Sequence, residues 1–185
     1  MRKTLQTLSG VLCLYASIAS ASGGAQMIDD FQANPEQRWR FIADTVMGGA
    51  SNGNVAFKTE GSRSFAHMTG NVSTKNNGGF IQIRRQLAKP PSNDTEGVRL
   101  VVRGNGQPYF LHLRTSGTIL PWQYYQARFN TKEDWHEIQI PLARFKRSGW
   151  MLKKTVVSKS INSIAVVAFG RDHSADIQVR ELGWY

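Results

Sequence analysis

Two arginines and an aromatic pair could form a ligand platform in the middle of the chain. Arg103 and Arg114 flank a segment that also carries Phe110 and His112. Successive side chains of an extended chain point to opposite faces, so these four residues would share the face opposite the aliphatic ones. A guanidinium group binds carboxylates, phosphates and vicinal hydroxyls through a planar fork of donors. The spacing predicts a ligand-binding face. The alternative is a solvated face whose arginines pair with Asp or Glu across strands.

Aromatic and amide side chains follow one another in a short stretch that contains Trp122, Gln123, Tyr124, Tyr125 and Gln126. Sugar-binding surfaces use this combination, because apolar ring faces stack on sugar rings while amides pair with hydroxyls. The candidate ligand contacts in this stretch are Trp122, Tyr125 and Gln126. The alternative is an ordinary sandwich core, and we expect Trp39 and Trp135 in the core and Trp122 at the surface.

A third candidate site is the loop that contains Asp44, Gly48 and Gly49. Adjacent glycines permit a tight crossover between sheets or a nest of backbone amides beside Asp44. Asp44 could cap the loop as an Asx-turn or hold a sugar hydroxyl. Calcium needs six or more oxygen ligands, and the sequence has no acidic cluster to supply them, so we expect no metal site.

Catalytic motifs find little support in the sequence. The histidines, His67, His112, His136 and His173, lack a metal-binding spacing, and His112 is interpreted as part of a strand face rather than as a general base. No serine lies in a G-x-S-x-G motif, and no glycine-rich motif indicates a dinucleotide. Glycoside hydrolysis needs two acids at one site; candidates such as Glu137 and Asp172 exist, but the sequence does not bring them together. We expect no catalytic residue and no cofactor.

These candidate residues lie on short runs of alternating apolar and polar residues, which predict an all-β fold. The expected strands are residues 55–58, 65–70, 79–85, 123–130, 135–140, 161–169 and 177–182, together with two strands within 97–115. About nine or ten strands in one domain indicate a sandwich of two packed sheets.

Two strand pairings are predicted from the turns between the runs. Residues 97–115 are expected to form a β-hairpin around a Gly-Asn-Gly turn, and residues 123–130 to pair with 135–140 around a polar turn. The apolar run at 161–169 indicates a strand buried on both faces. Residues 142–152 are expected to hold a short helical turn.

The N-terminus has the pattern of a signal peptide over residues 1–21, with Arg2 and Lys3 before an apolar stretch and cleavage near Ala21. A membrane anchor is less favoured because the stretch falls short of the ~20 residues that span a bilayer. A lipoprotein is disfavoured because Leu12 precedes Cys13. We expect a single exported domain over 22–185, periplasmic or secreted, without cysteine and therefore without disulfides.

The chain carries a formal net charge of +10. Such a surplus favours anionic partners such as phosphates, acidic lipid headgroups or acidic glycans, while export argues against nucleic acid. The alternative is solubility charge spread over many strands, since no basic run is longer than Arg84-Arg85 or Lys153-Lys154.

The most distinctive stretch is Trp39 followed by Asp44-Thr45-Val46-Met47-Gly48-Gly49-Ala50-Ser51. It resembles the opening motif of the complex I intermediate-associated protein 30 family. Similar blocks follow at residues 70–73, 76–80, 97–103, 109–115, 125–129 and 135–142. The resemblance runs from about Ile28 to Tyr185. It implies a galactose-binding-domain-like jelly-roll sandwich and an association with assembly of the mitochondrial NADH:ubiquinone oxidoreductase.

The sequence therefore predicts a non-catalytic binding or assembly-factor-like module of the cell envelope, which recognises a protein or a glycan through one sandwich face. Two alternatives stay open: a carbohydrate-active hydrolase, and an electrostatic scaffold that contacts an anionic membrane surface. The ligand and the oligomeric state are left open by the sequence.

Overall fold

Alternating apolar and polar residues form twelve strands between residues 26 and 185, the part of the chain that the computed structural model describes. Sheet A has the order β3 (Asn52–Glu60), β4 (Arg63–Val72), β12 (His173–Trp184), β6 (Gly97–Gly104) and β9 (His136–Pro141), and β1 (Gln26–Asp29) also pairs with β12. Sheet B has the order β10 (Lys146–Arg147), β8 (Tyr125–Asn130), β7 (Pro108–Thr115), β11 (Ile161–Phe169), β5 (Phe80–Gln86) and β2 (Trp39–Ala43). All strand pairs are antiparallel.

The strands are linked by loops that include five 3-10 helices, and residues 26–185 contain no α-helix. These are η1 (Pro35–Gln37), η2 (Asp44–Met47), η3 (Lys75–Asn77), η4 (Leu142–Arg144) and η5 (Ser158–Ser160). The position of η4 confirms the helical turn expected within 142–152. No helix in this part of the chain is long and apolar enough to span a membrane.

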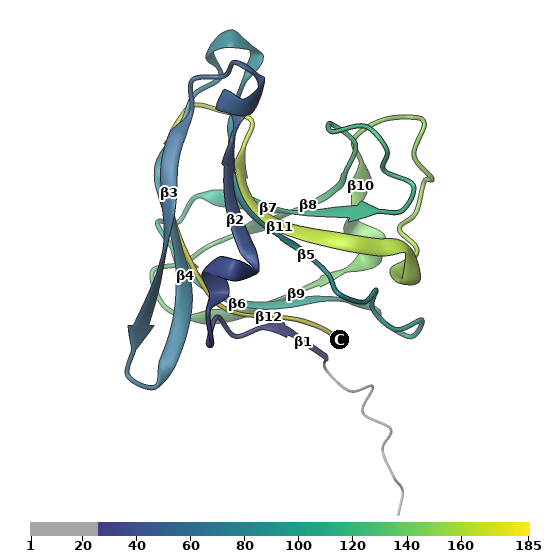
Figure 1. The fold of residues 1–185 in the computed structure, drawn as a ribbon, viewed down its shortest axis with the longest axis horizontal. Coiled ribbons are helices and arrows are strands. Elements are labelled where there is room, and N and C mark those ends of the chain that lie inside the picture. Colours follow the sequence, from purple (N-terminus) through teal and green to yellow (C-terminus); the bar gives the residue numbers. More distant parts are fainter. Residues whose placement is uncertain (1–25) are drawn as a thin grey trace, which may run out of the picture.

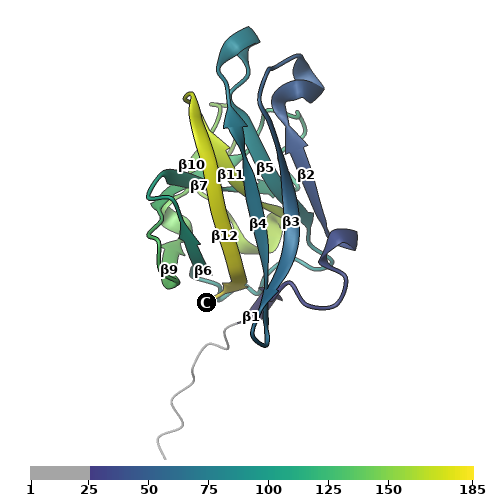
Figure 2. The same ribbon diagram turned by 90° about the vertical axis from the view of Figure 1, so that its left-hand side faces the viewer.

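The core lies between the two sheets, whose apolar faces pack together (Figure 1). Figure 2 shows β3 and β4 of sheet A in front of β2 and β5 of sheet B. Leu100 and Val102 of β6 and Leu111 and Leu113 of β7 are fully buried between the sheets. Burying a side chain of this size contributes roughly 1.5–3 kcal/mol. The predicted all-β sandwich is confirmed, with twelve strands in place of nine or ten.

Both predicted strand pairings are wrong. β6 and β7 belong to different sheets, so residues 97–115 form no hairpin, and β8 and β9 are separated in the same way. Residues at the predicted turn bond to other elements instead: Gly104 N donates to Lys132 O at 2.7 Å and Asn105 N to Asp176 O at 3.1 Å. Period-two alternation identifies the buried face of a strand, but it does not identify the neighbouring strand.

Strand β11 matches its predicted bounds and is buried on both faces from Ser163 to Ala168. It lies third from one edge of sheet B, between β7 and β5. This central position places small residues in the middle of the outer face of the sheet.

The predicted signal peptide over residues 1–21, its cleavage near Ala21 and Cys13 lie outside the described residues and stay predictions.

Asp29 joins β1, β2 and β5 at the inner side of sheet B. Its carboxylate accepts hydrogen bonds from Arg38, from Trp39 Nε1 at 2.8 Å and from Phe31 N at 2.8 Å, and it pairs with Arg85. Burial raises the pKa of Asp29, but these donors outweigh burial and hold the pKa below its ordinary value. Because Arg85 points inward, its neighbour Arg84 points to the outer face.

Candidate ligand-binding face

The outer face of sheet B carries one continuous row of paired residues across all six strands. In the order β2 to β10, the row contains Arg40, Arg84, Ala165, His112, Gln126 and Lys146. Strands lie about 4.8 Å apart, so five spacings give this row a length of about 24 Å. Together with the other outward residues of these strands, it forms what we call the basic face.

The basic face has cations and no carboxylate. Its outward strand positions include Arg40, Arg84, Arg114, Arg128 and Lys146 but no Asp or Glu. None of these five cations forms an ion pair with a residue in the described range 26–185. The positive charge of this face is therefore not balanced from within the face.

An aromatic cluster covers the middle of the basic face. His112 and Tyr124 stack with ring centroids 4.0 Å apart and an interplanar angle of 8°. Phe169 meets His112 and Phe110 edge-on, with centroids 5.9 Å apart in both pairs. Burial lowers the pKa of His112 to about 3, so the imidazole is neutral at neutral pH. The cluster offers ring edges and one partly exposed tyrosine face beside charged groups.

Three buried polar atoms of this face have no hydrogen-bond partner among residues 26–185: His112 Nε2, Gln126 Oε1 and Ser163 Oγ. His112 and Gln126 lie opposite each other across the β7–β8 pair, but no hydrogen bond joins His112 Nε2 to Gln126 Oε1. Leaving such a group unpaired costs about 1–3 kcal/mol. Unpaired buried groups on an outward face are candidates for ligand contacts.

Arg84 of β5 and Arg114 of β7 lie on either side of β11 on this face. Burial lowers the pKa of both guanidinium groups, and the charge of Arg114 lowers that of Arg84 further. Arg114 donates to the carbonyl oxygens of Thr118, Leu120 and Pro121 at 2.8–3.1 Å, so it anchors the loop before β8. The Arg84 guanidinium donates no hydrogen bond to any residue that the structure describes, so it is the free cation of this pair.

Two hollows of about 410 and 360 Å³ lie on the β8–β10 side of the molecule. The larger opens on the basic face beside Phe110 and Gln126, and both hollows share Arg128 and Arg144. Neither is lined by Asp or Glu. A glycosidase site needs two carboxyl groups, so these hollows give no support to the hydrolase alternative.

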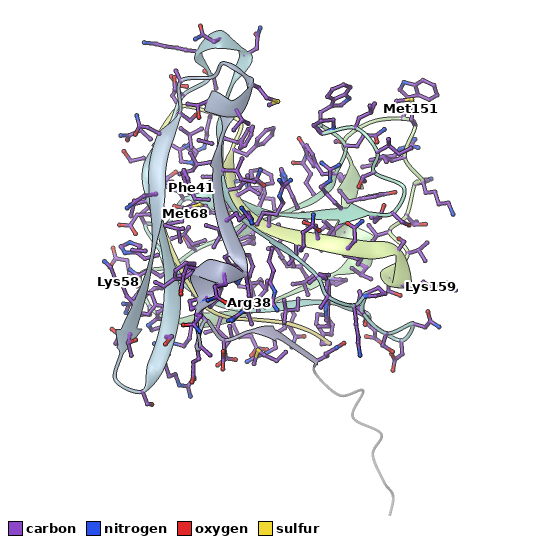
Figure 3. The ribbon with its side chains drawn as sticks, viewed as in Figure 1. Arg38, Phe41, Lys58, Met68, Met151 and Lys159 are labelled. Carbon is purple, nitrogen blue, oxygen red and sulfur yellow. The ribbon has the colours of Figure 1, made fainter. Side chains whose placement is uncertain are left out.

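The structure brings three predicted residues together on this face: His112 and Gln126 in the row, and Arg114 next to it. Trp122 lies in the loop that Arg114 anchors, and its side chain is 61% exposed, as expected. Figure 3 shows Met151 at the tip of the neighbouring loop, which is joined to the Trp122 loop by the hydrogen bond from Ser148 Oγ to Trp122 O at 3.0 Å. These two loops border the aromatic side of the basic face.

Tyr125 and Arg103 do not belong to this face. Tyr125 points into the core, and its hydroxyl donates to Lys153 O at 3.0 Å. Arg103 lies on the outer face of sheet A, because β6 and β7 are in different sheets. There it pairs with Glu60 at 3.2 Å and stacks over Trp135, with its guanidinium carbon 4.6 Å from the ring centroid. The expected shared face for Arg103 and Arg114 is therefore wrong.

The tryptophan predictions are partly right. Trp39 is 2% exposed and belongs to the core, as expected. Trp135 was expected in the core as well, but it lies between Arg103 and Arg180 on the outer face of sheet A. Its indole N–H donates to Glu60 at 3.0 Å, and its ring stacks with both guanidinium groups. Trp135 thus has its polar atom paired at the surface.

The Asp44 loop has the geometry of a structural cap. The buried carboxylate accepts hydrogen bonds from Ser51 N at 2.9 Å, Ser51 Oγ at 2.6 Å and Phe80 N at 3.1 Å, and from Gly79 N. Burial raises the pKa of Asp44, but these donors outweigh it and the pKa is lowered. The carboxylate thus has its acceptors occupied from within the chain, which favours loop capping over a sugar contact.

The two glycines of this loop are required by its shape. Gly48 has φ of 84°, in the left-handed region, and a Cβ on Gly49 would meet the Asp44 carboxylate at 2.3 Å. Gly48 O accepts a hydrogen bond from Asn76 of η3 at 3.2 Å, so the two loops lie side by side at the top of Figure 1. No group of three metal-ligating side chains occurs among residues 26–185.

Four residues of this face were not predicted from the sequence as site residues: Arg40, Arg84, Ser163 and Phe169. Arg84 alternates with Ile81 and Ile83, so its outward direction could have been read from the pattern. The residues that lie beside Arg84 on the sheet could not be read from the pattern, because β5 pairs with β2 and β11, which are far away in the sequence. The row of paired residues can be identified only when the order of the strands in sheet B is known.

The sequence profile of the complex I intermediate-associated protein 30 family matches residues 29–178. Among curated proteins, no relative matches the sequence.

Solved structures with a similar fold include the family 11 carbohydrate-binding module of the cellulosomal cellulase Lic26A-Cel5E from Clostridium thermocellum, with 14% identity and a TM-score of 0.71 over 87% of this chain and 94% of the module. That module in complex with a β-1,3-1,4-mixed-linked tetrasaccharide gives the same identity and TM-score, over 87% of this chain and 95% of the module. An exo-β-agarase matches with 8% identity and a TM-score of 0.57 over 85% of this chain and 24% of the agarase. At these identities the likeness is one of fold.

Proposed function

We propose a function from the premise that this chain belongs to the complex I intermediate-associated protein 30 family. The chain acts as a non-catalytic module that binds a glycan through the basic face of sheet B. A protein partner and the assembly role implied by the family stay predictions. We also propose that the module is exported to the cell envelope after cleavage near Ala21.

The observation that carries the proposal is the stack of Tyr124 on His112 beside Gln126, with unpaired buried polar atoms on an outward sheet face. Aromatic rings next to amide groups fit the alternating apolar and hydroxyl surfaces of a sugar. The fold likeness gives further support, because the family 11 module of similar fold is described in complex with a tetrasaccharide.

Glycan binding can be tested with the exported domain on a glycan array, followed by isothermal titration calorimetry for the glycans that bind. Tyr124→Ala is expected to weaken binding about tenfold, the effect of losing roughly 1.4 kcal/mol of stacking and contact energy. Gln126→Ala is expected to weaken binding to a similar or smaller extent.

The matched control is Gln139→Ala, because Gln139 is an exposed glutamine of sheet A that donates to Glu137 at 3.0 Å. This change should leave affinity unaltered. A domain that binds no glycan on the array, or that binds equally well with Tyr124→Ala, would contradict the proposed function. Cell fractionation and N-terminal sequencing of the mature chain test the location, and recovery of the uncleaved chain from the cytoplasm would argue against export.

A further inference from the structure

We infer that the glycan bound by the basic face is acidic, and that Arg84 holds one of its carboxylate or sulfate groups. This inference rests on the proposed function and adds the chemical class of the ligand. Three independent features of the face lead to it: the absence of carboxylates, the environment of Arg84, and the length of the row of paired residues.

The charge of the basic face differs from that of the outer face of sheet A. On sheet A, Arg63, Arg99, Arg103 and Arg180 each pair with a glutamate at 2.7–3.2 Å. On the basic face, five cations occur with no Asp or Glu at the outward strand positions. A protein that balances its charges on one sheet and leaves them unbalanced on the other has a surface that attracts anions.

Arg84 has the position of a primary anion contact. Its side chain is partly buried, faces Arg40 across the β2–β5 pair and lies near Arg114. Arg114 already donates to three loop carbonyls, whereas Arg84 has all five donors free within the described chain. Two neighbouring guanidinium groups without an acid repel each other, and a bound anion removes that repulsion through charge-assisted hydrogen bonds.

A buried hydroxyl lies close to this position in the register of the sheet. Ser163 is opposite Arg114 on β7, and Ala165, two residues further along β11, is opposite Arg84. Ser163 is 1% exposed and its Oγ has no hydrogen-bond partner among residues 26–185. A carboxylate or sulfate offers several acceptor oxygens, so one group could satisfy both a guanidinium and this hydroxyl.

The row is too long for a single small anion. Cations lie at both of its ends, Arg40 and Arg84 near β2 and Lys146 at β10, about 24 Å apart at about 4.8 Å per strand. The aromatic and amide residues His112 and Gln126 lie between them. Charge at both ends and stacking surfaces in the middle fit a chain of sugars with acidic groups. A lipid surface would contact only the exposed cations and would leave the buried polar atoms unpaired.

The test compares acidic polymers with their neutral counterparts by calorimetry at low salt. Polygalacturonate is paired with its methyl ester for the carboxylate, and dextran sulfate with dextran for the sulfate. At least one acidic polymer should bind at least tenfold more tightly than its neutral counterpart, with affinity that falls as NaCl is raised. The acidic polymer that binds identifies which anionic group the face prefers.

The key variant is Arg84→Gln, and its matched control is Arg63→Gln, which removes the same charge from the outer face of sheet A. Arg84→Gln should weaken the acidic polymer at least tenfold and leave a neutral polymer unchanged, whereas Arg63→Gln should change neither by more than about twofold. Circular dichroism melting of both variants checks that they are folded.

The outcomes separate the inference from the proposed function. Equal affinity for acidic and neutral polymers, or equal effects of the two substitutions, would overturn the inference and leave glycan binding intact. Binding to vesicles that contain phosphatidylglycerol, without binding to any acidic polymer, would overturn it in favour of a membrane. Failure to bind any of these polymers would overturn the inference alone, whereas failure to bind any glycan on the array would overturn the proposed function as well.

Discussion

The outer faces of the two sheets have the same strand geometry, but their arginines are paired with acids on sheet A and unpaired on sheet B. On sheet A, arginines alternate with glutamates, and Arg103 and Arg180 also stack on Trp135. On the outer face of sheet B, the arginines have no acidic partner, and three buried polar atoms are unpaired within the described residues, whereas Arg180 Nε is unpaired on the outer face of sheet A. A face whose arginines are paired with acids suits contact with water, while a face whose cations lack acidic partners suits contact with an anionic ligand. The difference indicates which side of the sandwich is functional.

The histidines of the two faces extend this comparison. His67 of sheet A pairs with the Asp176 carboxylate at 2.8 Å, whereas His112 of sheet B is stacked against Tyr124 and has no acid beside it. The folded protein therefore resists protonation of His112, whose pKa burial lowers to about 3. This feature gives the largest effect that we predict.

The first prediction concerns stability against pH. Between pH 6.5 and about 4, the unfolded chain protonates His112 while the folded chain does not, so the free energy of unfolding falls as pH falls through this range. The loss from this residue over this pH range is at most on the order of 3 kcal/mol, because the range spans 2.5 pH units and lies above the folded-state pKa of about 3. Urea denaturation at a series of pH values should show the loss in the wild type and much less of it in His112→Phe.

The contributions of other titrating groups can be separated from that of His112 in the same experiment. Burial also lowers the pKa of His173, but this residue is present in both proteins and cancels. Asp29 and Asp44, with pKa values below their ordinary range, add a loss of stability only below about pH 4. Parallel pH curves for the wild type and His112→Phe between pH 6.5 and 4 would show that His112 is not buried as a neutral ring.

The second prediction reverses the charge of Arg84, the proposed anion contact on the basic face. Arg84→Glu should reduce affinity for an acidic polymer by about a hundredfold, or roughly 2.7 kcal/mol, because a contact is lost and a repulsion is added. Arg63→Glu is the matched change on sheet A and should reduce affinity only by the general effect of net charge. Calorimetry at two salt concentrations distinguishes the local contact from this general effect. Similar losses in the two variants would contradict a site at Arg84.

The third prediction places a carboxylate on the outer face of sheet B, where the outward strand positions carry none. Gln82 lies on the outward side of β5, two residues before Arg84. Gln82→Glu should place a carboxylate near that arginine, as glutamates lie near the arginines of sheet A. Affinity for the acidic polymer should fall about tenfold, or roughly 1.4 kcal/mol, while affinity for a neutral glycan is unchanged. Equal losses for acidic and neutral polymers in equilibrium binding would indicate a steric effect instead.

The fourth prediction, which has the smallest expected effect, removes a carboxylate from the outer face of sheet A. Glu60 pairs with Arg103 and Arg180 and accepts the indole N–H of Trp135. Glu60→Gln should leave glycan affinity within about twofold of wild type, because an unpaired exposed cation by itself contributes little. A small decrease in melting temperature is expected. A marked gain of acidic-polymer binding at sheet A would show that unpaired charge is sufficient without the buried polar atoms and rings of sheet B.

Much of the fold, but less of the site, could be predicted from the sequence. The alternation around Leu100 and Leu111 correctly gave the buried faces of β6 and β7, and the family motif gave the sandwich. The pairing of these strands could not be predicted, because a strand's neighbour depends on contacts between residues far apart in the chain. His112, Arg114 and Gln126 were found since each lies outward next to aromatic residues. Arg84 and Ser163 gain their meaning only from the register of β11 with β5 and β7.

The most direct test of the central claim, that the basic face binds the ligand, is a nuclear magnetic resonance titration of the ¹⁵N-labelled domain with the acidic polymer that binds most tightly. Backbone amide signals of Arg84, His112, Gln126 and Ser163 should shift together and saturate at one affinity, while those of Arg63 and Arg103 on sheet A stay in place. Shifts concentrated on sheet A, or confined to the Asp44 loop, would contradict the account.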